Sequence, residues 1–261
     1  MSFKEYEPFD LAKSPFYIHE LQGYEIDNIL NVFCGFVEKV VGRINDGKEA
    51  TVYLCSPDPE SLAQGRIDHQ FLAAKMYKAN KFRSFENDRS YRNLNKIKDR
   101  RMAKAMRNKS SRGQKAFRNH WIDSEWRYLN QLYDAGVQCP KPYSHYDDGV
   151  LMSCSMDQQG PAPRLVDCRL TDEQAKNLLG GILDDVTTML QEDIVHGDLS
   201  AYNILYDGQT HCIIDVPQAV DIRTSANASE LLWRDLVNLG KYFSRYDLEI
   251  PIESFMGSLY R

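Results

Sequence analysis

The sequence predicts an α+β fold of two lobes, an antiparallel-sheet lobe followed by a mainly helical lobe. Stretches rich in β-branched and aromatic residues at 36–41, 51–55 and 71–77 are typical of successive strands. Farther along, 171–190 and 229–243 repeat apolar residues every three or four positions, as amphipathic helices do. We expect the strands to form an antiparallel meander.

A glycine- and proline-rich stretch at 160–163 marks the boundary that we expect between the two lobes. We predict an N-terminal arm with a short helix at 1–32, a sheet lobe at 33–155 and a helical lobe at 156–261. Residues 80–115 contain few large apolar side chains and show no clear period, so we expect a flexible basic insert within the sheet lobe.

The net charge of −5 over 261 residues is unevenly distributed. Residues 75–118 contain 16 Lys and Arg against 3 Asp and Glu, and the remainder is acidic. Such a segment favours a phosphate-rich partner, a nucleotide or a nucleic acid, although a merely solvated loop would look similar. The charged first ten residues, the lack of a long apolar run and six scattered cysteines predict a cytoplasmic protein without a membrane segment.

Two features of the predicted sheet indicate a phosphate-binding end. Gly47, in the turn after the first strand, would let the backbone approach a ligand closely, as would the turn of an ordinary hairpin. Lys75, at the end of the third strand, could reach phosphates as a point charge. We therefore expect Gly47, its neighbour Lys48, and Lys75 on the phosphate side.

Apolar residues at helical spacing predict a helix that ends before Gly136: Ile122, Trp126, Leu129 and Tyr133. Glu125 lies on the edge of this face. If the helix packs beside the third strand, Glu125 can pair with Lys75 and orient it, although an exposed glutamate would fit the sequence as well.

A strand at 150–156 runs towards the lobe boundary and can offer backbone groups of residues such as Ser153 to an adenine base. The helix at 171–190 begins with a capping box, in which Thr171 is followed three residues later by Gln174. We assign the apolar stripe of this helix to packing alone.

The pattern that predicts the chemistry is His196-Gly197-Asp198-Leu199, followed by Asn203 and then by Ile213-Ile214-Asp215. Two acids and an amide supply the oxygen ligands that Mg²⁺ prefers. In this order, protein kinases use the first acid as catalytic base and the amide and later acid as metal ligands. A solvated acidic turn would explain any one of the three residues but not their joint spacing. The pattern predicts phosphotransfer and a protein-kinase-like fold.

The residues after Asp215 lack an A-P-E motif, which predicts a trimmed helical lobe without an activation segment. Apolar residues mark the face of the helix at 229–243: Leu232, Leu236, Leu239 and Phe243. Arg234 and Asp235 on this helix are interpreted as an ordinary solvated pair.

Between about residues 40 and 245, the chain closely resembles the RIO family of atypical kinases, in the subfamily without an N-terminal winged helix. Ser200 stands two residues after Asp198, where ordinary protein kinases usually carry lysine, and Pro217 replaces a more usual serine. The matching motifs are Gly47-Lys48-Glu49-Ala50-Thr51-Val52-Tyr53, Ala73-Ala74-Lys75-Met76-Tyr77-Lys78, Ala135-Gly136-Val137-Gln138-Cys139-Pro140 with Pro142, Gly160-Pro161-Ala162-Pro163, His196-Gly197-Asp198-Leu199-Ser200 with Tyr202-Asn203, and Ile213-Ile214-Asp215-Val216-Pro217-Gln218.

The resemblance implies a serine/threonine kinase or ATPase that uses ATP and Mg²⁺, or Mn²⁺ in its place. Asp198 would be the catalytic acid, Lys75 would contact phosphates, and Glu125 would pair with Lys75. Asn203 and Asp215 would hold metal. Apolar residues would line the adenine pocket: Val52, Ala73, Met152, Leu205 and Ile214.

The resemblance also implies autophosphorylation on serines of the basic insert, which holds Ser84, Ser90, Ser110 and Ser111. Some family members act mainly as ATPases through a phospho-aspartate, which would form on Asp215 here. Members in eukaryotes and archaea act in small-subunit ribosome maturation, so a ribosomal or RNA assembly is an implied partner.

Two other functions remain open from the residues. Small-molecule kinases of the aminoglycoside or choline type share the acid-amide-acid pattern, but the loop at Gly47 and the serine-bearing insert argue against them. A nucleotide-gated binding module would keep the same residues and use ATP to control docking on a large assembly.

Overall fold

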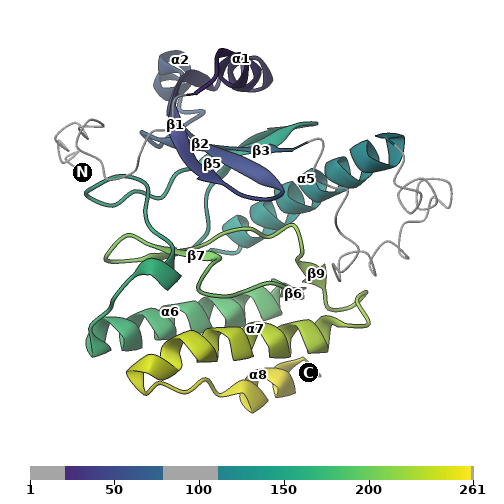
Figure 1. Cartoon of the computed structure of the whole chain (residues 1–261). Coiled ribbons are helices and arrows are strands. Elements are labelled where there is room, and N and C mark those ends of the chain that lie inside the picture. The colour runs from purple at the N-terminus through teal and green to yellow at the C-terminus, as the bar shows by residue number, and fades with distance from the viewer. Residues whose placement is uncertain (1–20, 79–110, 260–261) are drawn as a thin grey trace.

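The computed structural model describes residues 21–78 and 111–259, in which a sheet-bearing part packs on a helical part (Figure 1). The first part opens with α1 (Gly23–Val32) and includes the short α2 (Pro59–Ala63). Its five antiparallel strands lie in the order β1-β2-β3-β5-β4. Their bounds are β1 (Val37–Asp46), β2 (Ala50–Pro57), β3 (Leu72–Tyr77), β4 (Pro142–Tyr146) and β5 (Gly149–Ser153).

β3 is the middle strand, and its alternating side chains serve two different cores. Ala74 and Met76 join the cluster beneath α1, which includes Phe33 and Tyr53. Ala73 and Tyr77 join the larger cluster on the side of the helical part. Lys75 lies between these two residues in the alternation, so its side chain also faces the helical part.

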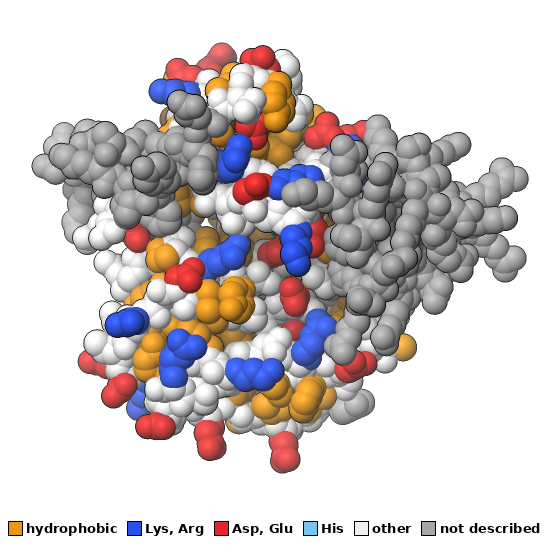
Figure 2. All heavy atoms as spheres, viewed as in Figure 1, with side chains coloured by type: hydrophobic (Ala, Val, Ile, Leu, Met, Phe, Trp, Pro, Cys, Tyr) orange, Lys and Arg blue, Asp and Glu red, His pale blue; other side chains and the backbone are white. Residues whose placement is uncertain are grey.

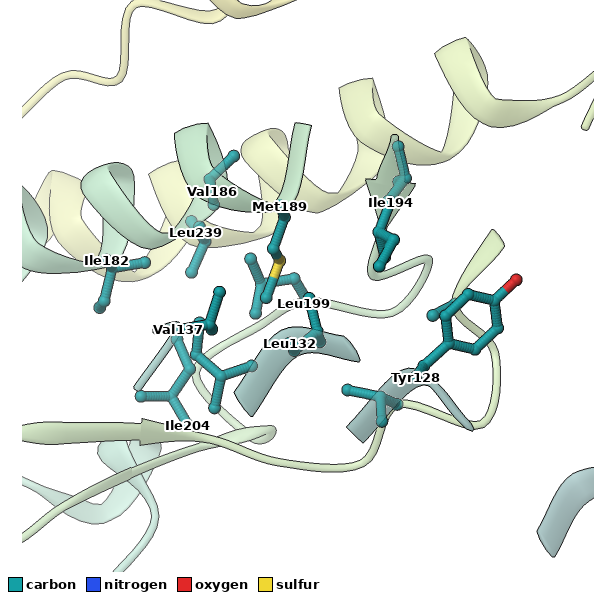
Figure 3. Close-up of a cluster of buried hydrophobic side chains, with 14 of the residues drawn as sticks. Tyr128, Leu132, Val137, Ile182, Val186, Met189, Ile194, Leu199, Ile204 and Leu239 are labelled. Atoms are coloured by element: carbon teal, nitrogen blue, oxygen red, sulfur yellow. The ribbon is translucent and has the colours of Figure 1, made fainter. Parts of the chain in front are cut away.

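The long helix α5 (Ser111–Asp134) runs between the sheet and the helical part (Figure 1). Figure 3 shows Tyr128 and Leu132 of α5 packed with Met189 of α6 and Ile194 of β6. The helical elements are α6 (Asp172–Gln191), α7 (Ala228–Phe243) and α8 (Ile252–Ser258), with the short 3-10 turns η4 (Leu165–Asp167) and η5 (Ser244–Tyr246). This shared core fixes α5 against the helices that support the loops of the second part.

Two short strand pairs carry those loops. The antiparallel pair β6 (Ile194–Val195) and β9 (Val220–Asp221) brackets the segment from His196 to Ala219. The hairpin of β7 (Ile204–Tyr206) and β8 (His211–Ile213) lies within it. Asp207 closes the hairpin turn by accepting bonds from the backbone N–H groups of Gln209 and Thr210 at 2.8 and 2.6 Å.

Several predicted elements match the structure, and others need correction. The strands, the helix near residue 25, the capping box at Thr171 and the hairpin at Asp207-Gly208 are present. β4 was not predicted, because Pro140 and Pro142 favour an irregular connection. The strand predicted at 150–156 ends at Ser153.

The predicted helix before Gly136 begins much earlier, at Ser111. The last residues of the predicted flexible insert, 111–115, are therefore helical, and its remainder at 80–110 lies outside the described residues. Tyr133, predicted to face the core, is 37% exposed, whereas Leu132 is fully buried. The core-facing side of α5 is thus rotated slightly from the predicted stripe at its C-terminal end.

Candidate functional site

The ammonium group of Lys75 joins two carboxylates that come from two different elements of the fold. It donates to Oε1 of Glu125 on α5 at 2.5 Å and to Oδ1 of Asp215, just after β8, at 2.8 Å. Burial alone would lower the pKa of Lys75, but the two carboxylates outweigh it and raise the pKa above its ordinary value. Lys75 therefore stays charged and links the sheet, α5 and the β7–β8 hairpin.

The two carboxylates around Lys75 differ in environment. Glu125 is only 2% exposed, and burial raises its pKa, which Lys75 only partly offsets. The side chain of Asp215 is 42% exposed. Burial of Asp215 would raise its pKa, but the charge and hydrogen bond of Lys75 lower it overall. Asp215 is thus an ionised, accessible carboxylate, available to a cation.

Asp215 also has an unusual backbone conformation, with φ of 68° in the left-handed region. A non-glycine residue in this region carries strain that the surrounding structure must hold, and such residues are frequent at functional sites. The neighbouring Ile214 N–H donates to the Asn203 carbonyl at 3.0 Å. The hairpin thereby brings Asn203, at the start of β7, next to Asp215.

The loop from His196 to Asn203 is ordered by bonds among its own residues. The Asn203 side-chain nitrogen donates to the Asp198 carbonyl at 2.9 Å and to Asp198 Oδ2 at 3.3 Å. His196 Nδ1 accepts from the Asp198 N–H at 3.2 Å, so its Nε2 donates to the Ile214 carbonyl at 3.1 Å. Burial lowers the pKa of His196 to about 4, which keeps this ring neutral.

Asp235, interpreted from sequence as solvated, is instead 2% exposed and supports this loop from α7. Its two oxygens accept from the backbone N–H groups of Gly197 at 2.7 Å and Leu199 at 3.0 Å. Arg234 donates to the Gly197 carbonyl. The solvated-pair interpretation was therefore wrong. Buried carboxylates need hydrogen-bond donors, and here the donors lie in a loop far away in the sequence.

Gly197 itself is required by the geometry of the loop. Its φ is 80°, and a Cβ at this position would lie 2.6 Å from the carbonyl oxygen of Gln218. The Gln218 side chain donates to Asp198 Oδ2 at 3.5 Å. The segment after Asp215 therefore packs directly on the Asp198 loop. β9 and α7 follow closely, consistent with the prediction that no long activation segment intervenes.

The β1–β2 turn is tied to the end of β3. The Gly47 N–H donates to the Ala50 carbonyl at 3.0 Å, and Lys78 Nζ donates to the Gly47 carbonyl at 2.7 Å. Lys78 also pairs with Asp46, a link that the sequence interpretation missed. Lys48, predicted at the site, is exposed in this turn.

The predicted adenine-lining residues come from both parts of the molecule. Ala73 of β3 and Met152 of β5 are buried cross-strand partners, whereas the other three are partly buried: Val52, Leu205 and Ile214. The Ser153 N–H donates to the Lys141 carbonyl and its hydroxyl accepts from the Lys141 N–H, both at 2.8 Å. The Ser153 N–H is therefore already paired with Lys141.

Figure 2 shows acidic and basic side chains gathered across the middle of one face, between the sheet-bearing and helical parts. The donor set of Asp198, Asn203 and Asp215 is made of hard oxygen ligands, as Mg²⁺ requires. Because the Asn203 side-chain nitrogen is turned to Asp198, its oxygen is directed elsewhere and can serve a cation. Within the described residues, no group of three or more His, Cys, Asp or Glu forms an all-protein metal site. A site with few protein ligands, completed by phosphates and water, fits Mg²⁺.

The model of the RIO domain matches residues 60–255 of this chain. The chain belongs to the RIO family. Similar curated proteins include a RIO-type serine/threonine-protein kinase Rio1 of Thermoplasma acidophilum, 33% identical over 49% of this chain and 66% of that protein. The human serine/threonine-protein kinase RIO1 is 29% identical over 83% of this chain, but only 35% of the human protein is covered. This chain therefore matches only part of the length of these RIO relatives.

Solved RIO structures share the fold. The Rio2 kinase of Chaetomium thermophilum superposes with a TM-score of 0.62 and 18% identity, covering 85% of this chain and 63% of that one. A second structure, described as an ADP/Mg²⁺-phosphoaspartate complex of the same kinase, gives a TM-score of 0.61 at 18% identity, with 85% and 62% coverage. The α+β, two-lobed kinase-like fold predicted from sequence is confirmed. Among the described residues, no helix is both long and apolar enough to span a membrane.

Proposed function

We propose that this chain is an ATP- and Mg²⁺-dependent serine/threonine kinase, with ATP hydrolysis as a related activity. The observation that carries the proposal is the chain of contacts from Glu125 through Lys75 to Asp215, beside Asp198 and Asn203. The names of the curated relatives support the reaction class. The RIO-domain match favours a protein kinase over a small-molecule kinase.

Each residue has a role in this proposal. Lys75, held by Glu125, contacts ATP phosphates, and Asn203 and Asp215 hold Mg²⁺, or Mn²⁺ in its place. A metal ion bound there would neutralise charge on the β- and γ-phosphates. Gly47 and Lys48 cover the phosphates, and the Ser153 carbonyl faces the adenine. Apolar residues enclose the base: Val52, Ala73, Met152, Leu205 and Ile214.

For transfer to serine, Asp198 orients the hydroxyl and accepts its proton. The serine oxygen bonds to the γ-phosphorus as the bond to the bridging oxygen breaks, and ADP leaves. Positioning and charge neutralisation carry most of this reaction. We expect the acceptor to be the protein itself, on serines of residues 80–115, or a protein of a ribosomal or RNA assembly.

The accessible carboxylate of Asp215 favours a second candidate activity, hydrolysis through an aspartyl-phosphate. An Asp215 oxygen would attack the γ-phosphorus and release ADP, and water would then cleave the acyl-phosphate to inorganic phosphate. A phosphoaspartate is named in the description of one Rio2 structure, which supports this route by analogy.

Incubation of the chain with γ-labelled ATP and Mg²⁺, beside Asp198→Ala and Asp215→Ala, tests both activities. Stable phosphoserine that is lost in both variants supports the kinase. A label on Asp215 that hydroxylamine removes, as it does an acyl-phosphate but not a phosphoserine, supports the hydrolytic route. If neither wild type nor variants become labelled or consume ATP, the enzyme assignment fails and a nucleotide-gated binding module becomes the better explanation.

A further inference from the structure

Tyr77 stands two residues after Lys75 on β3, so both side chains face the helical part. The Tyr77 hydroxyl donates to Oε2 of Glu125. Both residues are buried, at 5% and 2% exposure. Glu125 thus accepts one bond from Lys75 at Oε1 and one from Tyr77 at Oε2, both donors lying on the same strand.

This double attachment restricts Glu125 more than a single ion pair does. A carboxylate held at one oxygen can still rotate about its last bond, whereas one held at both oxygens has a fixed plane. Because both donors belong to β3, the side chain of Glu125 ties α5 to one short stretch of the central strand. Burial raises the pKa of Tyr77 well above its ordinary value, so the hydroxyl keeps its proton and remains a donor.

The bond of Tyr77 differs from that of Lys75 in what a nucleotide would do to it. The ammonium of Lys75 is divided between Glu125 and Asp215, and phosphates would compete for it. Among the described residues, the hydrogen bond recorded for the Tyr77 hydroxyl is the one to Glu125. It can hold Glu125 in place while Lys75 adjusts towards the phosphates.

We propose that Tyr77 is a positioning residue for the phosphates of the nucleotide, acting through Glu125 and Lys75. This inference rests on the proposed function. It predicts a specific division: removing the hydroxyl should weaken binding of the phosphates and leave binding of the adenosine moiety unchanged. A purely structural role in the sheet would affect both.

The chain offers a matched control on the other face of the same sheet. Tyr53 of β2 is also 5% exposed, and its hydroxyl donates to Oε1 of Glu25 at 2.6 Å. It belongs to the core beneath α1, away from Lys75. Tyr53→Phe therefore makes the same chemical change in an equally buried position without touching the candidate site.

The experiment is calorimetric titration of the full chain with Mg²⁺-ATP and, separately, with adenosine. We expect Tyr77→Phe to bind ATP about five- to tenfold more weakly, the scale of one ordinary intramolecular hydrogen bond, and adenosine within about twofold of wild type. Tyr53→Phe should leave both affinities unchanged. Equal ATP affinity in Tyr77→Phe and wild type, or parallel loss of ATP and adenosine affinity, would overturn the inference.

A second measurement tests whether Tyr77 acts through Glu125. In a Glu125→Ala background, adding Tyr77→Phe should cause no further loss of ATP affinity, because the hydroxyl has lost its acceptor. An additive loss would show that Tyr77 acts by another route and would also overturn the inference. Failure of wild type to bind ATP would remove the proposed function itself, whereas normal wild-type binding with an unaffected Tyr77→Phe would remove only the role of Tyr77.

Discussion

On opposite faces of one sheet, this chain places two clusters that each contain a tyrosine, a glutamate and a basic side chain. The site cluster, at the candidate functional site, is Tyr77, Glu125 and Lys75, and the outer cluster is Tyr53, Glu25 and Arg43. In each, a tyrosine hydroxyl and a cation donate to one glutamate. In each, the cation also lies over the tyrosine ring, at 5.4 Å in the site cluster and 6.0 Å in the outer one.

The clusters differ in the acceptors to which the cation donates its hydrogen bonds. Within the described part of the chain, Arg43 directs its hydrogen bonds to Glu25 alone, because its Nη2 donates to both carboxylate oxygens, at 2.8 and 3.0 Å. Lys75 gives Glu125 one bond and extends another to Asp215, a partly exposed acid after β8. The outer cluster joins α1 to the sheet. The site cluster ends on an accessible group that a ligand can reach, and this difference separates a structural cluster from a candidate site.

The largest expected effect comes from removing the cation in each cluster. Lys75→Met should lower ATP turnover by about 10²-fold or more, because misplacing a reacting group costs on this scale. Arg43→Met should leave turnover within about twofold and lower the thermal midpoint instead, through the loss of charged hydrogen bonds. The measurements are steady-state ATPase or autophosphorylation rates and a thermal melt of each variant, which separate loss of turnover from loss of stability. Equal losses of turnover would mean that the two clusters are not functionally distinct.

The same distinction can be sharpened at the loop from His196 to Asn203. Asp235→Asn would leave one of the two backbone N–H groups, of Gly197 or Leu199, without its acceptor. We expect about a tenfold loss of turnover, on the scale of one unsatisfied buried donor. As a control, Asp221→Asn changes an acid outside the candidate site, where it accepts from the Arg223 N–H at 2.8 Å, and its turnover should stay at the wild-type level. Unchanged turnover in Asp235→Asn would show that the loop does not need this support.

The smallest expected effect is on the pH dependence of stability, where the two glutamates should have opposite signs. Burial alone would raise the pKa of Glu25, but its hydrogen bonds from Tyr53 and the Gln22 backbone, together with Arg43, lower it. The contribution of Glu25 to the free energy of unfolding is therefore present above its unfolded pKa, and it is lost as the pH falls through the lower pKa of the folded state. Glu125, with its pKa raised on folding, binds its proton more tightly in the folded state. The contribution of Glu125 to the free energy of unfolding is present at low pH, and it is lost as the pH rises through the raised pKa of the folded state.

Urea unfolding from pH 3.5 to 7 of wild type, Glu25→Gln and Glu125→Gln measures these signs. The stability advantage of wild type over Glu25→Gln should grow with pH, and its advantage over Glu125→Gln should shrink. If both stability differences changed with pH in the same direction, the environments assigned to Glu25 and Glu125 would be contradicted.

Most of the site could be predicted because its residues lie in sequence patterns that are local to one loop, hairpin, strand or helix. The order Asp198, Asn203 and Asp215 needs only one loop and one hairpin, which the Asp207-Gly208 turn specifies. The pairing of Lys75 with Glu125 followed from placing each on a recognisable strand or helix. The catalytic, metal-binding and adenine-binding roles of these residues, and the lobe boundaries, remain predictions.

The rest depended on contacts that no local pattern encodes. Asp235 looks like any helix acid until the fold brings Gly197 against it, and Lys78 looks like any lysine until it reaches the β1–β2 turn. Tyr77 and Tyr53 are similar residues in similar strands. What distinguishes their clusters is the cation that shares each glutamate, Lys75 in one and Arg43 in the other. The start of α5 was missed because residues 111–120 have little apolar periodicity.

The most direct test of the central claim is calorimetric titration of the chain with ATP, with and without Mg²⁺, beside Asp215→Asn. If the site cluster ends on a metal-binding acid, wild type should bind ATP more tightly with Mg²⁺, and Asp215→Asn should lose that Mg²⁺ dependence. ATP binding that responds neither to Mg²⁺ nor to the substitution, or no binding by wild type, would contradict the account.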